Sequence, residues 1–331
     1  MNRITVLVGL AGLLAGCSSD DSNASNGGSA GSAASGGSAG SNAGGSGGSV
    51  GGTSAGGAAG SGGTGPQCAD GPGYATNPAP VRVDQVTGTI IDPAGAPAEG
   101  VFIQVCGTDF CVNGTTNANG ELVTCSNGGP VCTPGVAPGQ NMTQPAMKYG
   151  DGLTYVKFGY PLAGSTPRFD LGTLKIISID PPGSGQPITP GTTAVSNGVE
   201  LSLAAEAKVT FDELTYVTDE EKQFRAVIFD PTDAPEALDP ALNLELLVGT
   251  TPIETEFCPA ATLTLPNSKG WSPDAEVEFF VHGVSIEEEW APYAGWAKVS
   301  NGKVSSDGTK VATNPDEGIP HLSVIGVRLK P

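Results

Sequence analysis

The chain has 331 residues, 50 of them glycine, and a formal net charge of −19 at pH 7. A protein this acidic repels phosphate backbones, so nucleic acid is excluded as an expected partner. The charge favours solubility and carries little information about the fold.

The N-terminus predicts export across a membrane. Arg3 supplies a positive charge, and residues 4–13 form an apolar run shorter than the ~20 residues of a membrane-spanning helix. The run ends at Leu14-Ala15-Gly16-Cys17. This motif resembles the lipobox of bacterial lipoproteins, which implies cleavage after residue 16 and acylation of Cys17.

The acylated Cys17 would make membrane lipid the first partner of the chain, because several acyl chains together give stable anchoring. Ser18 rather than aspartate follows the cysteine, which favours sorting to the bacterial outer membrane. The expected location is therefore lipid-anchored at the outer membrane, with the head either periplasmic or exposed at the cell surface.

Six further cysteines predict three disulfides, since an even number in an oxidising compartment is typical of a disulfide framework. Their spacing lacks the paired short intervals of a zinc site, so neither a metal nor a cofactor is expected. Sequence alone does not fix the connectivity. We favour two local pairs and one long-range pair: Cys106–Cys111, Cys125–Cys132 and Cys68–Cys258.

Composition divides the chain into a leader, a stalk and two β regions. The stretch between Asp21 and Asp70 has no charged residue and consists mainly of glycine, serine and alanine, so it cannot bury enough apolar surface to order itself. The predicted parts are a signal peptide (1–16), the lipidated cysteine with a disordered linker (17–79), a first β-sandwich (80–178), a Pro/Gly linker (179–193) and a second β-sandwich (194–331).

The first β region begins with alternating strands at residues 81–83 and 86–91, and a later strand is expected at 153–158. Residues 86–92, 95–97, 100–105 and 116–120 are similar to the carboxypeptidase regulatory-like domain, with Asn117 in place of the aspartate in the family's turn. The resemblance implies a small transthyretin-like β-sandwich without an active site.

The second β region alternates apolar and polar residues from Val199 to Phe211, which predicts a long strand or a hairpin. Six further strands and a helical turn within 235–242 complete an expected sandwich. Segments at 198–201, 257–266, 307–308 and 318–323 faintly resemble the β-sandwich of ankyrins and netrin receptors. The overall expectation is an all-β chain with two sandwiches.

Three side-chain groups are candidates for a site. Trp290, Tyr293 and Trp296 could form an aromatic platform for sugar rings, although core packing is the more common role of such residues. His282 and His321 lack a nucleophile or a metal-binding partner in the sequence. The acidic runs 219–221 and 287–289 fit solvated loops better than a calcium site.

The favoured function is a non-catalytic, membrane-anchored lipoprotein that displays a structural or interaction module. The alternative is a glycan-binding surface module that uses the Trp290, Tyr293 and Trp296 cluster, with envelope polysaccharide as its partner instead of a surface protein. A secreted hydrolase of unknown type is the third hypothesis.

Overall fold

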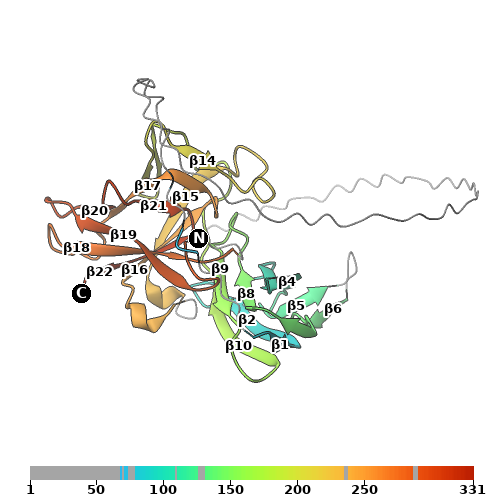
Figure 1. The fold of residues 1–331 in the computed structure, drawn as a ribbon. Helices are drawn as coiled ribbons and strands as arrows, with labels where there is room; N and C mark the ends of the chain where they lie inside the picture. The colour runs from blue at the N-terminus through green and yellow to red at the C-terminus, as the bar shows by residue number, and fades with distance from the viewer. Residues whose placement is uncertain are drawn as a thin grey trace, which may run out of the picture. The chain divides into compact units, whose positions relative to one another are not determined.

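The described residues of the computed structural model are 68, 71–73, 79–108, 110–125, 131–234, 238–285 and 290–331. They belong to one compact unit, which runs from Gly60 to Pro331 and is built from β-strands (Figure 1). The all-β prediction is therefore confirmed. The signal peptide, Cys17 and most of the predicted 17–79 linker lie outside the described residues.

The first β region, residues 79–178, holds ten strands in three sheets. A six-stranded antiparallel sheet has the order β6-β5-β4-β3-β8-β9, β2 pairs with β10 in parallel, and β1 pairs with β7. The strands are β1 (Val81–Val83), β2 (Gln85–Ile91), β3 (Phe102–Cys106), β4 (Cys111–Thr116), β5 (Leu122–Cys125), β6 (Cys132–Pro134), β7 (Gln140–Met142), β8 (Ala146–Tyr149), β9 (Phe158–Pro161) and β10 (Arg168–Lys175).

The second β region, residues 179–331, forms one 12-stranded sheet in which β14 and β21 both pair with β17. Its elements are β11 (Gln186–Pro187), β12 (Thr193–Ser196), β13 (Val199–Ser202), β14 (Lys208–Thr210), β15 (Gln223–Phe229), η1 (Pro231–Asp233), η3 (Pro240–Leu242), β16 (Leu246–Thr251), β17 (Glu256–Pro266), β18 (Glu276–His282), β19 (Trp296–Val304), β20 (Lys310–Thr313), β21 (Ile319–His321) and β22 (Val324–Leu329).

The two ends of this sheet meet. The Val195 backbone NH donates to the Gln186 side chain at 2.9 Å, and the Ala226 NH donates to Ser196 Oγ at 2.9 Å. Strand β12 therefore lies beside β11 and β15, and the curved sheet encloses a core. Strand β11 falls inside the predicted 179–193 linker, so this segment contributes to the sheet.

The two regions share a hydrophobic cluster. The first cluster contains Ile103 and Tyr149 of the first region together with Leu247 and Phe280 of the second. The second cluster lies within the second region and includes Phe279, the neighbour of Phe280 along β18. Because successive side chains of a strand point to opposite faces, β16 and β18 bury apolar residues on both faces of the sheet.

Polar contacts also join the regions, mainly through the loop before β9. The fully buried Arg225 donates from Nη1 to the carbonyl oxygens of Leu153 at 2.5 Å and of Asp180 at 2.6 Å. The Thr251 hydroxyl donates to the Gly152 carbonyl. Desolvation of buried carbonyl groups is costly unless they are hydrogen-bonded, so these contacts fix the loop.

Two predicted strands differ from the structure. The expected strand at 153–158 is wrong, because the Asp151 carboxylate accepts the backbone NH groups of Leu153, Thr154 and Tyr155 and holds a turn; β9 begins only at Phe158. The alternation at 199–211 is divided between β13 and β14 by a turn in which the Ala207 NH donates to the Ala204 carbonyl.

The helical turn expected within 235–242 is present as η3, where the Asp239 carboxylate caps the turn by accepting the Ala241 NH at 2.9 Å. Residues 235–237 lie outside the described part. Across the described ranges, no helix has the length and apolar character needed to cross a membrane.

The turn before β5 depends on a glycine. Gly120 has φ +75°, and an added Cβ would lie 2.3 Å from the Ile90 carbonyl oxygen. We expect Gly120→Ala to destabilise the head by about 2–4 kcal/mol in urea unfolding, through backbone strain and this contact.

Gly95→Ala is the matched control, because Gly95 has φ +87° and no atom within 4 Å of the added Cβ. Its expected cost is about 1 kcal/mol, from the backbone conformation alone. Equal losses of unfolding free energy in the two variants would contradict the close approach at Gly120.

Candidate functional site

An open cleft of about 660 Å³ lies where the two β regions meet. Its walls come from β9 and β10 of the first region, and from the start of β19 and the residues before η3 of the second. Small-molecule sites in proteins typically have volumes of roughly 300–1,000 Å³. The size and position of the cleft therefore suit a ligand.

Three aromatic rings line the cleft: Tyr160 of β9, Phe169 of β10 and Trp296 of β19. Each side chain is half-buried and packs against the first cluster. Packing against the core fixes the rings, while their remaining surface faces the cleft. Little conformational entropy is lost when a ligand contacts side chains that are already ordered.

His282 fixes the wall that carries Trp296. Its Nε2 accepts the Gly159 backbone NH at 2.9 Å, so the neutral ring carries its proton on Nδ1, which donates to the Gly295 carbonyl at 2.8 Å. The imidazole also lies 4.8 Å, centroid to centroid, from the Trp296 indole. The bond to Gly159 joins the two regions and the bond to Gly295 orients the ring, which gives His282 a positioning role.

Charged side chains border the aromatic rings. Arg168, Asp170 and Asp239 are exposed and line the cleft. One oxygen of Asp170 accepts the Gly172 NH at 3.1 Å, and Asp239 caps η3. Among the described residues, the Arg168 guanidinium makes neither an ion pair nor a side-chain hydrogen bond. It is thus available to a ligand.

The predicted aromatic cluster is divided between the two cores. Trp290 packs against the second cluster and Trp296 against the first. The Tyr293 ring lies 5.8 Å from Lys148 Nζ, and its hydroxyl oxygen is buried. Of these three candidates, only Trp296 lines the cleft.

The second histidine, His321, is buried in β21 at 4% exposure. Neither of its ring nitrogens has a hydrogen-bond partner within the described ranges. Burial lowers the pKa of His321 to about 4, and burial likewise lowers the pKa of His282 to about 4 despite the bond to Gly295. Both rings are therefore neutral at pH 7.

The acidic run 219–221 is largely exposed, and the run 287–289 lies outside the described residues. In the part of the chain that the structure describes, no group of three or more histidine, cysteine, aspartate or glutamate side chains is placed to hold a metal ion.

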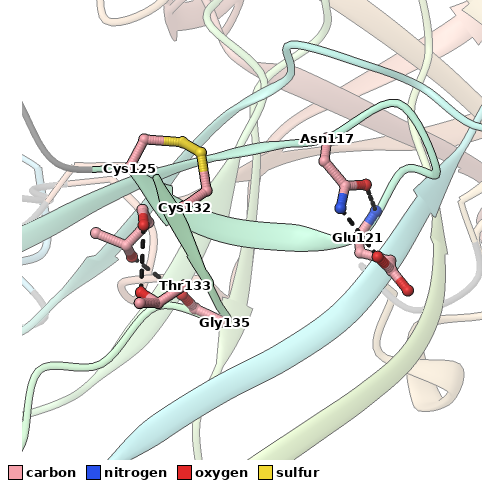
Figure 2. Close-up of a disulfide and its surroundings, with 7 residues drawn as sticks. Asn117, Glu121, Cys125, Cys132, Thr133 and Gly135 are labelled. Carbon is pink, nitrogen blue, oxygen red and sulfur yellow. Dashed lines mark hydrogen bonds between the residues drawn. A yellow bond between two sulfur atoms is a disulfide. The ribbon is translucent and has the colours of Figure 1, made fainter. Parts of the chain in front are cut away.

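The structure forms the three disulfides with the pairing that we favoured: Cys68–Cys258, Cys106–Cys111 and Cys125–Cys132. The two local disulfides join residues directly opposite each other in β3–β4 and in β5–β6. Figure 2 shows the Cys125–Cys132 bridge, beside which the Thr133 hydroxyl donates to the Thr124 carbonyl at 3.2 Å. The bridge thus closes a hairpin that has few strand residues of its own.

A second hollow, of about 510 Å³, lies beside this hairpin and is lined by Cys132, Asn117 and Glu121, among others. Asn117 and Glu121 hydrogen-bond to each other across the turn, with Asn117 Nδ2 donating to the Glu121 carboxylate at 2.9 Å (Figure 2). Since these polar groups already satisfy each other, the first cleft is the stronger candidate site.

Tyr160, Arg168 and Phe169 were not among the candidates that the sequence indicates. They are separated in sequence from Trp296 by more than 100 residues and come together only because the two regions pack on each other.

No protein-family model, no curated protein and no solved structure matches this chain.

Proposed function

We propose that this chain is a lipid-anchored, non-catalytic binding module that the cell displays outside the cytoplasm. Cys17 carries the lipid, residues 18–67 provide reach, and the β head presents the cleft. The observation that carries the proposal is the head itself, in which all six cysteines of residues 68–331 form disulfides. Such a framework is typical of proteins that work in an oxidising compartment.

Features of the cleft favour binding over catalysis. Its rings are ordered by the core, and both histidines of the chain are buried and serve the packing of the head. A histidine that acts as a general acid or base must reach the reacting proton, which a ring engaged or enclosed on all sides does not do. Binding by display is therefore the function that we propose, with outer-membrane anchoring as its location.

The anchor is tested by a single substitution. In the native bacterium, we expect the wild-type chain to incorporate radiolabelled palmitate and to sediment with outer membranes. Cys17→Ser should lose the label and leave the membrane fraction almost completely, because one thioether and one amino terminus carry all the acyl chains. Labelling and density fractionation measure both effects.

Ser19→Ala is the control, since it changes the same segment without removing the sulfur. It should keep both the label and the membrane location. A wild-type chain without lipid, or a Cys17→Ser chain that remains on the membrane, would overturn the proposed anchor.

A further inference from the structure

We infer that the cleft formed by Tyr160, Phe169 and Trp296 binds a neutral oligosaccharide. This inference rests on the proposed function, because it names the ligand class of the displayed head. The site differs from the platform of Trp290, Tyr293 and Trp296, because residues of both β regions line it.

The aromatic rings provide the apolar part of the recognition. Tyr160, Phe169 and Trp296 come from three different strands and leave part of each ring facing the same open cleft. A pyranose ring has an apolar face of C–H groups, which stacks on an aromatic face, while its hydroxyl groups remain at the edge. Three rings around a cleft of about 660 Å³ provide surfaces for more than one sugar unit.

The charged residues provide the polar part. Arg168 offers several NH donors in a fixed plane, and Asp170 and Asp239 each retain a carboxylate oxygen that is not committed to the backbone contacts described above. Adjacent hydroxyl groups of a sugar pair with such planar groups in a bidentate manner. Donors and acceptors next to aromatic rings are thus matched to a polyol, whereas a purely apolar ligand would leave them unpaired.

Charge selects against anionic glycans. Two carboxylates and one guanidinium give the rim of the cleft a net negative charge, and the whole chain carries −19. This field repels uronic acids and phosphorylated saccharides as they approach. The ligand that fits the aromatic faces, the polar rim and the charge is therefore a neutral oligosaccharide.

The cleft is already formed by contacts that do not involve a ligand. His282 joins Gly159, next to Tyr160, to Gly295, next to Trp296, and these two bonds hold the facing walls together. Preformed sites bind with a smaller ordering cost. A rigid cleft of this kind discriminates by shape, so we expect one linkage type to bind better than the others.

The test is calorimetric titration of the full lipidated chain in a detergent without a sugar headgroup. The probes are the neutral oligosaccharides maltohexaose, cellohexaose, xylohexaose and chitohexaose, and the anionic hexagalacturonate. We expect saturable binding of at least one neutral probe and none of hexagalacturonate. Phe169→Ala and Arg168→Gln should each weaken that binding by about tenfold or more.

Matched controls separate the cleft from other surfaces. Phe102→Ala removes an exposed phenyl ring outside the cleft, Arg82→Gln removes an exposed guanidinium outside it, and Trp290→Ala tests the alternative platform. All three should retain wild-type affinity. Thermal unfolding confirms that each variant is folded, and Arg168→Gln, at an exposed position, keeps the test decisive if Phe169→Ala unfolds.

Three results would overturn the inference: no binding of any neutral probe, equal binding of hexagalacturonate, or binding that Trp290→Ala abolishes and Arg168→Gln leaves intact. If the chain is lipid-anchored but binds no saccharide, the inference fails and the displayed head has a protein partner instead. If it binds a saccharide without being anchored, the proposed display function fails and the cleft assignment stands.

Discussion

Lowering the pH from 6.5 to 4.5 is expected to destabilise the folded head by several kcal/mol, because two histidines are buried in their neutral form. His282 and His321 each have a pKa of about 4 in the folded chain, against an ordinary value of 6.5. The unfolded chain binds protons at these residues below pH 6.5, whereas the folded chain does not until about pH 4.

The sign follows from proton linkage. A depressed histidine pKa means that the full stability is present above pH 6.5 and is lost as the pH falls toward 4. Each histidine contributes a slope of about 1.4 kcal/mol per pH unit and a total of about 3 kcal/mol. Urea unfolding at pH 7, 6, 5 and 4.5 measures the slope.

The two aspartates with the lowest pKa values do not contribute to the pH dependence in this range. Asp230 and Asp307 have pKa values of about 2, held down first by hydrogen bonds from the Lys269 and Ser305 side chains respectively. The folding stability that these two carboxylates contribute is lost only below the ordinary aspartate pKa of 3.8, which lies beneath the pH range of the measurement. The pKa values of Glu221, Glu276, Glu278 and Glu317 are also lowered from the ordinary value of 4.5, so the stability that they contribute begins to be lost near the lower end of the range. A loss of stability between about pH 6.5 and 5.5 therefore reports on the histidines.

Two substitutions test which histidine causes the loss of stability at low pH. His321→Leu should halve the slope and leave the stability at pH 7 unchanged or higher, because it removes a ring whose nitrogens have no partner within the described residues. His282→Leu should also halve the slope but lower the stability at pH 7, since it leaves the Gly159 NH and the Gly295 carbonyl unpaired. A flat profile in the wild-type chain would contradict both assignments.

The parts of this fold that depend on residues close together in the sequence are predictable, whereas the parts that depend on contacts between distant residues are not. The alternation in β2 and the Gly120 turn depend on neighbouring residues, so the sequence predicts them. The false strand at 153–158 has an equally regular pattern. It failed because one side chain, Asp151, competes with strand pairing for three backbone NH groups.

The packing of the two regions on each other was harder to foresee. Its signal is present in β16 and β18, where Leu246-Leu247-Val248 and Phe279-Phe280-Val281 are continuous apolar runs. Such runs indicate a strand buried on both faces, but they do not identify the partner surface. The cleft is a product of that packing, and for this reason only Trp296 of its three aromatic residues was a candidate beforehand.

Removing the Cys68–Cys258 disulfide is expected to cost more stability than removing either local one. The two cysteines are 190 residues apart, and a cross-link over such a loop restricts the unfolded chain by about 5 kcal/mol in the chain-entropy description. The Cys125–Cys132 bridge closes a separation of 7 residues and is worth about 2 kcal/mol in the same terms. The difference arises in the unfolded state.

The comparison uses the double variants Cys68→Ser/Cys258→Ser and Cys125→Ser/Cys132→Ser in the full chain. Cys106–Cys111 is the poorer comparator, because Cys106 is fully buried and its replacement also removes packing. Urea unfolding should show a loss about 3 kcal/mol larger for the long-range variant. Equal losses would mean that Cys68–Cys258 does not restrict the unfolded chain.

The Cys68–Cys258 disulfide also determines where the N-terminal segment is attached to the head. Cys68 is bonded to Cys258 of β17, the strand that pairs with β13, β14, β20 and β21. A tension applied through an anchored Cys17 would enter the head at this strand in the oxidised chain. In the Cys68→Ser/Cys258→Ser variant, β1 would be the first of the described strands to bear the tension, and β1 has three residues and forms a two-stranded sheet with β7. Force spectroscopy from the N-terminus should therefore unfold this variant at lower force than the Cys125→Ser/Cys132→Ser variant.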